Sequence, residues 1–361
     1  SVHKSLGKAE KREIKEKNLA IERANIVMQD VYKFSTEAGE KRISQARQDV
    51  GNGCIYLYDN ADQLLRMAKA MPKRTLEEKE IRSDAIKNAR IKKRSARLLR
   101  KYGADSIECI KYLSYYTEYY KQKNYDSALP NWRQAYKLCP PTARYSLLSD
   151  GTTLLKRVLQ ANSKNPIYKE ALVDSIMKIY DERIQYWPKY ETTSLNNKAL
   201  DMYNYMKDEP EKLYEGLTEA VAKLGTKARA NIYLFQINTA VDLYKDGKLD
   251  PEAVISAYET AVENINAMPA KNDVEKRSNE KTVADIESLF ITSQVASCDN
   301  LIALFTPRFE ADPQNVDLAK NIVKMMGITE GCTDNDLFLN AVTTMHTMEP
   351  SHVSAYNLYK L

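Results

Sequence analysis

The side chains that most often carry catalysis or metal binding are few in this 361-residue sequence. Its three histidines are His3, His346 and His352, and His346 has no second histidine or cysteine at the spacing of a metal site. The sequence contains no glycine-rich phosphate loop, nucleophile elbow or HExxH pair. Paired carboxylates such as Asp181 and Glu182 stand in helix-end contexts, where capping explains them. The sequence therefore predicts a non-enzymatic protein without a metal or a cofactor.

A basic run near residue 100 is the strongest charge feature. Thr75 and Glu78 have the spacing of a capping box, which predicts a helix that starts acidic and ends basic, as the helix dipole favours. Two interpretations of the basic end compete. It binds nucleic acid or another anionic surface, or it is an ordinary solvated helix face, and runs of charge are more often solvated faces. No aromatic residues are interleaved to stack on bases. The run consists of eight residues without an acid among them: Lys87, Arg90, Lys92, Lys93, Arg94, Arg97, Arg100 and Lys101.

Charge and composition indicate an all-α chain with two regions. Hydrophobic residues make up 43% and charged residues 29%, with only 11 Gly and 12 Pro, which is typical of a helix-rich globular protein. Residues 1–103 carry 25 Lys and Arg against 14 Asp and Glu, whereas residues 104–361 carry 29 against 35. This asymmetry predicts a basic helical N-terminal region, 1–103, followed by a second domain, 104–361. No apolar run reaches the length of a membrane helix, so we expect no transmembrane segment.

The stretch from Cys109 to Pro140 predicts a helical hairpin. In its first half, Ile110, Leu113, Tyr116 and Tyr120 recur at three- and four-residue steps, and Asp126 is the expected cap of the second helix. The order of residue types resembles a tetratricopeptide repeat. That repeat has a tyrosine late in its first helix, then a small residue, an aromatic residue and a final proline, and this stretch has these residue types at the same spacings. The residues that carry this resemblance are Tyr119, Ala128, Trp132, Ala135 and Pro140.

The resemblance implies an α-solenoid of stacked helical hairpins across residues 104–361. The amino-acid sequences of two segments, Lys101 to Pro140 and Ala311 to Leu318, are also similar to those of tetratricopeptide proteins of Bacteroidetes-type bacteria. That likeness implies an exported, periplasmic or envelope-associated interaction protein, with a cytoplasmic location as the alternative. The family lines its inner groove with first helices of each hairpin, which here implies a partner-binding groove formed by Ile110, Leu113, Thr117, Tyr120 and Lys121.

Further hairpins are expected along the chain. A polar stretch at 270–281 is expected to be an exposed loop, and residues 352–358 are expected to open another hairpin that the chain leaves incomplete or that a partner caps. In the N-terminal region, helices are expected over 11–34 and 43–50 and before Pro72. The expected helix pairs are 145–159 with 167–187, 195–206 with 213–224, 230–244 with 251–268, 283–295 with 299–309, and 316–326 with 337–348.

The five cysteines have no CxxC spacing, which argues against a zinc site. Cys109 and Cys139 fall at positions that helices would bury, so we expect both to be small core residues. Cys298 and Cys332 lie about one repeat apart, at equivalent turns of neighbouring units. A disulfide there would contribute roughly 3–4 kcal/mol. Two reduced thiols are an equally good interpretation.

Three functions follow from these features. The first is a scaffold that binds a protein or peptide in the groove of the solenoid. The second is binding of nucleic acid or an anionic surface through residues 87–101. The third is a glycan- or nutrient-binding envelope protein, favoured by the family likeness and by 24 Tyr against 6 Phe, although most tyrosines are expected to pack between helices.

Overall fold

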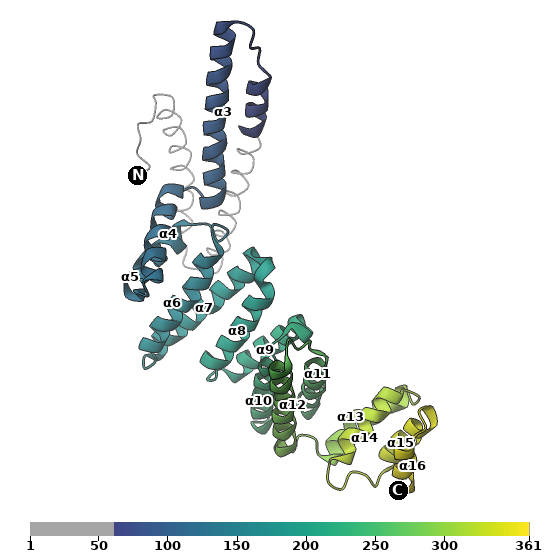
Figure 1. Cartoon of the computed structure of the whole chain (residues 1–361). Coiled ribbons are helices and arrows are strands. Elements are labelled where there is room, and N and C mark those ends of the chain that lie inside the picture. Colours follow the sequence, from purple (N-terminus) through teal and green to yellow (C-terminus); the bar gives the residue numbers. More distant parts are fainter. Residues whose placement is uncertain (1–60, 361) are drawn as a thin grey trace. The chain divides into compact units, whose positions relative to one another are not determined.

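The computed structural model describes residues 61–360, and these residues contain helices and no strand (Figure 1). The prediction of an all-α chain is thus confirmed for the described part. The chain divides into two compact units, Ser1–Glu191 and Thr192–Leu361. The charge-based division at Gly103 falls inside the first unit and stays a prediction. The helices expected over 11–34 and 43–50, together with His3 and Cys54, lie outside the described residues.

The described part of the first unit begins with an antiparallel pair, helical residues 61–70 and α3 (Leu76–Tyr102) (Figure 1). The predicted capping box is present, since the hydroxyl of Thr75 accepts from the amide of Glu78 and the carboxylate of Glu78 accepts from the amide of Thr75. The pair is held by a small apolar cluster in which Leu65 and Ala68 meet Ala89 of α3.

Helices α4 (Ser106–Lys121) and α5 (Tyr125–Leu138) form the hairpin that the sequence predicts. The cap of α5 is Asn124, whose side chain accepts from the amide of Ser127, so the prediction of Asp126 as the cap is wrong. Asp126 lies instead in the first helical turn, where its negative charge suits the helix dipole. Leu113, Tyr116, Ala128, Trp132 and Ala135 are all buried and form the core of the hairpin.

Cys109 and Cys139 form a disulfide, which the prediction of two small core residues did not include. Both are buried, as expected. Cys109 lies near the start of α4 and Cys139 follows the last residue of α5. The bond therefore closes the open end of the hairpin.

The next hairpin of the first unit consists of α6 (Tyr145–Ala161) and α7 (Pro166–Tyr186), followed by the short helix η1 (Pro188–Tyr190). Helix α5 packs on α6, and the indole nitrogen of Trp132 donates to the carbonyl of Leu147 over 2.7 Å. The indole of Trp187 donates to the carbonyl of Pro141. Trp132 thus connects α5 to α6, and Trp187 connects the end of α7 to the turn that joins the two hairpins.

The second unit begins with α8 (Glu191–Tyr205), α9 (Pro210–Leu224), the short helix η2 (Gly225–Lys227), α10 (Ala230–Lys245) and α11 (Pro251–Ala267). Helix α10 packs on both α9 and α11, and Met202 of α8 lies against Gly216 of α9. The rings of Tyr203 on α8 and Phe235 on α10 are stacked with centroids 4.0 Å apart. Asn196 of α8 donates to the carbonyl of Lys227 and accepts from the amide of Arg229. These contacts join α8 to α10 and to the segment that precedes it.

The predicted loop at 270–281 is helical, so this prediction is wrong. Helix α12 (Asp273–Ser293) starts at the cap Asn272, whose side chain accepts from the amide of Glu275. Most side chains of its first half are exposed, whereas Ile286 and Phe290 in its second half are buried. Helix α12 packs on α10 and α11, so the expected pairing of 283–295 with 299–309 is also wrong.

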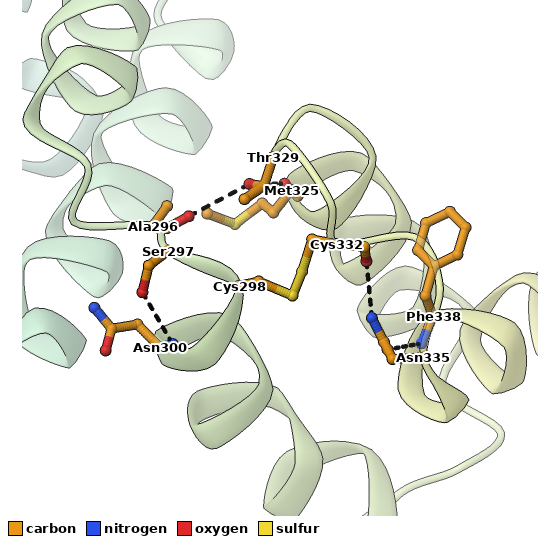
Figure 2. The surroundings of a disulfide bond; sticks show 9 residues. All are labelled: Ala296, Ser297, Cys298, Asn300, Met325, Thr329, Cys332, Asn335 and Phe338. Carbon is orange, nitrogen blue, oxygen red and sulfur yellow. Dashed lines mark hydrogen bonds between the residues drawn. A yellow bond between two sulfur atoms is a disulfide. The ribbon is translucent and has the colours of Figure 1, made fainter.

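The end of the second unit comprises α13 (Cys298–Ala311), α14 (Val316–Gly327), α15 (Asp336–Met348) and α16 (His352–Tyr359). Helices α14 and α15 form the predicted hairpin. Cys298 and Cys332 are joined by a disulfide (Figure 2). The bond connects the start of α13 to the turn beyond α14, beside a hydrogen bond from the hydroxyl of Thr329 to the carbonyl of Ala296.

Candidate functional site

The residues predicted to line a groove occupy different environments on α4. Ile110 is 36% exposed and Lys121 is exposed at the helix end, whereas Thr117 and Tyr120 are half-buried. Leu113 is 1% exposed and belongs to the hairpin core, so its assignment to a groove surface is wrong. The helical period explains the difference, because Leu113 points to the same side as the buried Cys109 and Tyr116.

Three of the predicted residues, Ile110, Thr117 and Lys121, share one face of α4 with Ile107 and Ser114, which the prediction did not include. The spacing of this set places all of it on one side of the helix, and Ile107 is 71% exposed. We call this set the α4 face, and its members are Ile107, Ile110, Ser114, Thr117 and Lys121.

A polar cluster joins α4 to α6 beside the α4 face. The hydroxyl of Tyr116 donates to a carboxylate oxygen of Asp150 over 3.3 Å. At the start of α6, the guanidinium of Arg144 donates to the hydroxyl of Thr117 over 3.2 Å. Tyr120 also hydrogen-bonds to Asp150. A carboxyl group, a guanidinium group and hydroxyl groups from two successive hairpins therefore meet at one place, where Tyr116 is buried and the others are half-buried.

Burial dominates the electrostatics of this cluster. It raises the pKa of the Asp150 carboxyl, while hydrogen bonds from Tyr116 and Tyr120 act in the opposite direction. Burial first, and then the charge of Asp150, raises the pKa of Tyr116 to about 12. The same two causes raise the pKa of Tyr120. Both tyrosines are thus neutral at neutral pH, and their hydroxyl groups act as hydrogen-bond donors toward the carboxyl group of Asp150.

A second polar group lies deeper in the same unit and has a structural role. Arg183 of α7 is 4% exposed, and its guanidinium donates to the hydroxyls of Tyr145 and Thr152 on α6. The cation also lies 4.9 Å from the ring centre of Tyr180. The contacts with Tyr145 and Thr152 hold α6 against α7, and Arg183 is almost wholly shielded from solvent.

The basic residues of α3 divide into two groups. The ammonium of Lys93 is half-buried and binds Asp62 over 2.7 Å, and this ion pair lowers the pKa of Asp62. The other seven side chains of the predicted basic run are exposed: Lys87, Arg90, Lys92, Arg94, Arg97, Arg100 and Lys101.

Several tyrosines do pack between helices. Tyr116, Tyr180 and Tyr233 are buried, and Tyr258 stacks on Phe290 with ring centroids 4.0 Å apart. In contrast, Tyr115 and Tyr119 are 49% and 37% exposed on the side of α4 away from the α4 face. Tyr119, one of the repeat-like positions, is therefore not a core residue.

Within residues 61–360, no group of three or more His, Cys, Asp or Glu side chains has the arrangement of a metal site. The ring of His346 hydrogen-bonds to the hydroxyl of Ser354, which links α15 to α16. None of the described helices is, by itself, long and apolar enough to cross a membrane.

Sequence reasoning missed Asp150 and Arg144 because their roles depend on the packing of α4 against α6. Tyr116 and Asp150 lie one repeat apart, since 34 residues separate them. A search for polar residues one repeat beyond each tyrosine of α4 would have found this pair. Neither a scan of protein-family models nor a search of the curated proteins found a match to this chain.

Proposed function

We propose that the chain is a non-enzymatic scaffold, a tetratricopeptide-like solenoid whose α4 face and adjoining Asp150 cluster bind a protein or peptide. In this proposal, the first helices of successive hairpins form the binding wall. The succession of hairpins within each unit, tied by tryptophan and asparagine side chains, supports this architecture.

One observation carries the proposal: exposed apolar side chains lie next to half-buried polar groups on the same side of α4. Ile107 and Ile110 are 71% and 36% exposed, and the polar contact between Thr117 and Arg144 lies further along the same face. Protein interfaces combine apolar anchors with a few oriented polar groups in this way. A fitting partner would place an apolar side chain against the two isoleucines. Its backbone polar groups would form hydrogen bonds with the side chains of Arg144 and Asp150.

The two disulfides support a location in an oxidising compartment, such as the periplasm or the cell envelope. Disulfides persist in such compartments and are rare in the reducing cytosol. Trapping free thiols with an alkylating reagent under denaturing conditions at cell lysis, which exposes buried cysteines, tests this part of the proposal. We expect Cys109, Cys139, Cys298 and Cys332 to remain unmodified until the protein is reduced, and rapid modification of all four would contradict it.

Affinity capture with matched variants tests the binding face. The full chain, Ile110→Asp and Ile167→Asp are each used to capture proteins from a lysate of the source cells. Ile167 is a suitable control, since it is 82% exposed near the start of α7 and away from the α4 face. We expect the same partner with the wild type and Ile167→Asp, and its loss with Ile110→Asp. Equal recovery with all three proteins, or no specific partner at all, would refute the proposed site.

A further inference from the structure

Helix α3 has two faces of opposite character. Ala89 and Ala96 are buried on one side, where Ala89 meets the apolar side chains of helical residues 61–70. Five of the basic residues recur at three- and four-residue steps on a different side, so that they form a single row. We call this row the basic stripe, and it consists of Lys87, Arg90, Arg94, Arg97 and Lys101, all exposed.

The basic stripe has no acid to balance it within residues 61–360. None of its five side chains forms a hydrogen bond or ion pair there, and the ammonium of Lys101 lies 5.2 Å from the ring centre of its neighbour Tyr102. Lys93, by contrast, is paired with Asp62 on another side of the helix. From Lys87 to Lys101 the stripe extends about 21 Å at the rise of an α-helix. Five like charges in a row repel one another, and an extended anionic surface relieves that repulsion.

We propose that the basic stripe docks this protein on a membrane surface rich in anionic phospholipids. A row of solvated Lys and Arg side chains on one face of a helix suits the phosphate groups of a lipid surface, and each such residue contributes about 1 kcal/mol, or roughly five-fold in partitioning. The partly exposed Leu98 flanks the row and adds an apolar contact at the headgroup level.

Two observations favour lipid over nucleic acid. No aromatic side chain stands among the five stripe positions to stack on bases. The two disulfides also favour an oxidising compartment over the cytosol and the nucleus, which contain most of the nucleic acid of a cell. This inference does not depend on the α4 face, because the two surfaces lie on different helices and are removed by different substitutions.

Vesicle co-sedimentation of the full chain tests the inference. The probes are vesicles of phosphatidylglycerol and phosphatidylcholine in equal amounts, and vesicles of phosphatidylcholine alone. We expect binding to the anionic vesicles at low salt, a steep loss of binding as salt is raised, and no binding to the neutral vesicles. Duplex and single-stranded DNA oligonucleotides are offered as competitors at the same ionic strength.

Matched variants separate the basic stripe from overall charge. The triple substitution Arg90→Gln, Arg94→Gln and Arg97→Gln removes three stripe charges while keeping good helix formers. The control, Lys212→Gln, Lys227→Gln and Lys245→Gln, removes three exposed lysines of the second unit. We expect the stripe variant to lose about a hundred-fold in partitioning and the control to stay within about two-fold of wild type. Equal binding by both variants, absence of vesicle binding, or displacement of the protein from vesicles by DNA would overturn the inference.

Discussion

Gly151 of α6 lies directly against the indole ring of Trp132 of α5, with no room for a methyl group between them. A Cβ atom at Gly151 would come within 2.3 Å of Cζ2 of the ring. The same indole donates its N–H to the carbonyl of Leu147 over 2.7 Å. The ring is thus wedged into the next hairpin by shape and by a hydrogen bond, and it fixes how the two hairpins of the first unit pack.

We expect Gly151→Ala to lower the free energy of unfolding by about 1–3 kcal/mol, because the new methyl group forces the rigid ring out of place. In an open helical position the same change would stabilise by up to about 1 kcal/mol. Gly327, at the end of α14, has no atom within 4 Å of the position of a Cβ and provides the control. Urea unfolding monitored by circular dichroism measures both. Similar stability for Gly151→Ala and Gly327→Ala would contradict the tight packing.

Removing either disulfide should destabilise the protein. The bonds close loops with sequence separations of 30 and 34 residues. Loops of that length correspond to about 3–4 kcal/mol of constraint on the unfolded chain. We expect the double substitutions Cys109→Ala with Cys139→Ala, and Cys298→Ala with Cys332→Ala, each to lower the unfolding midpoint in urea. A reductant should lower the midpoint of the wild type and have no further effect once all four cysteines are replaced. A wild-type midpoint that does not respond to reductant would show that the bonds are absent.

Asp150 should make the protein less stable as pH rises. Burial raises the pKa of its carboxyl above the ordinary value of 3.8, so the folded state holds this proton more tightly than the unfolded state does. Between the unfolded and folded pKa values the unfolded state binds fewer protons, and stability falls as pH rises through that window. Asp150→Asn removes the charge and keeps an oxygen that accepts from Tyr116.

We therefore expect the free energy of unfolding of Asp150→Asn, measured relative to that of the wild type, to be higher at pH 7 than at pH 3.5. Urea unfolding at both pH values measures this gain. The exposed Asp126 supplies a control substitution, Asp126→Asn, for changes of surface charge. If the stability difference between Asp150→Asn and wild type does not change with pH, burial of the carboxylate is not the controlling factor.

Asn196 should be a strong determinant of stability in the second unit. Its side-chain amide donates to the carbonyls of Thr192 and Lys227 and accepts from the amide of Arg229, and the residue is 4% exposed. We expect Asn196→Ala to lower the free energy of unfolding by about 1–3 kcal/mol, since it leaves buried backbone groups unpaired. Asn196→Asp keeps an oxygen that accepts from the amide of Arg229 but loses the hydrogen bonds donated to Thr192 and Lys227, so this variant should also be less stable than the wild type. Wild-type unfolding of either variant would contradict this bridging role.

Much of the helical pattern could be predicted from the sequence, because local chemistry determines it. The capping box at Thr75, the stop after Leu138 and the proline-initiated helices at Pro166, Pro210 and Pro251 are all set by residues within one turn of the boundary. Only the second half of α12 was expected to be helical, over 283–295, because its first half contains a single apolar residue, Val274, and so shows no apolar period. Asn272 followed by Glu275 was the signal for its start.

The candidate site could be predicted only in part. The helical period is sufficient to place Ile110, Thr117 and Lys121 on one side of α4, but it does not show which side α5 and α6 cover. For that reason Leu113 was wrongly assigned to a surface. The contact between Tyr116 and Asp150, and the disulfide between Cys109 and Cys139, depend on how hairpins pack, which residue spacing alone does not determine.

Site-specific photo-crosslinking tests the proposed binding function most directly. A photoreactive amino acid is placed at Ile110, on the α4 face, and in a second protein at Ile167, and each is irradiated in the source cells. The account predicts a discrete crosslinked protein from position 110 that is absent from position 167 and disappears when Ile107→Asp is added. Crosslinks of equal pattern and yield at both positions, or none at position 110, would contradict it.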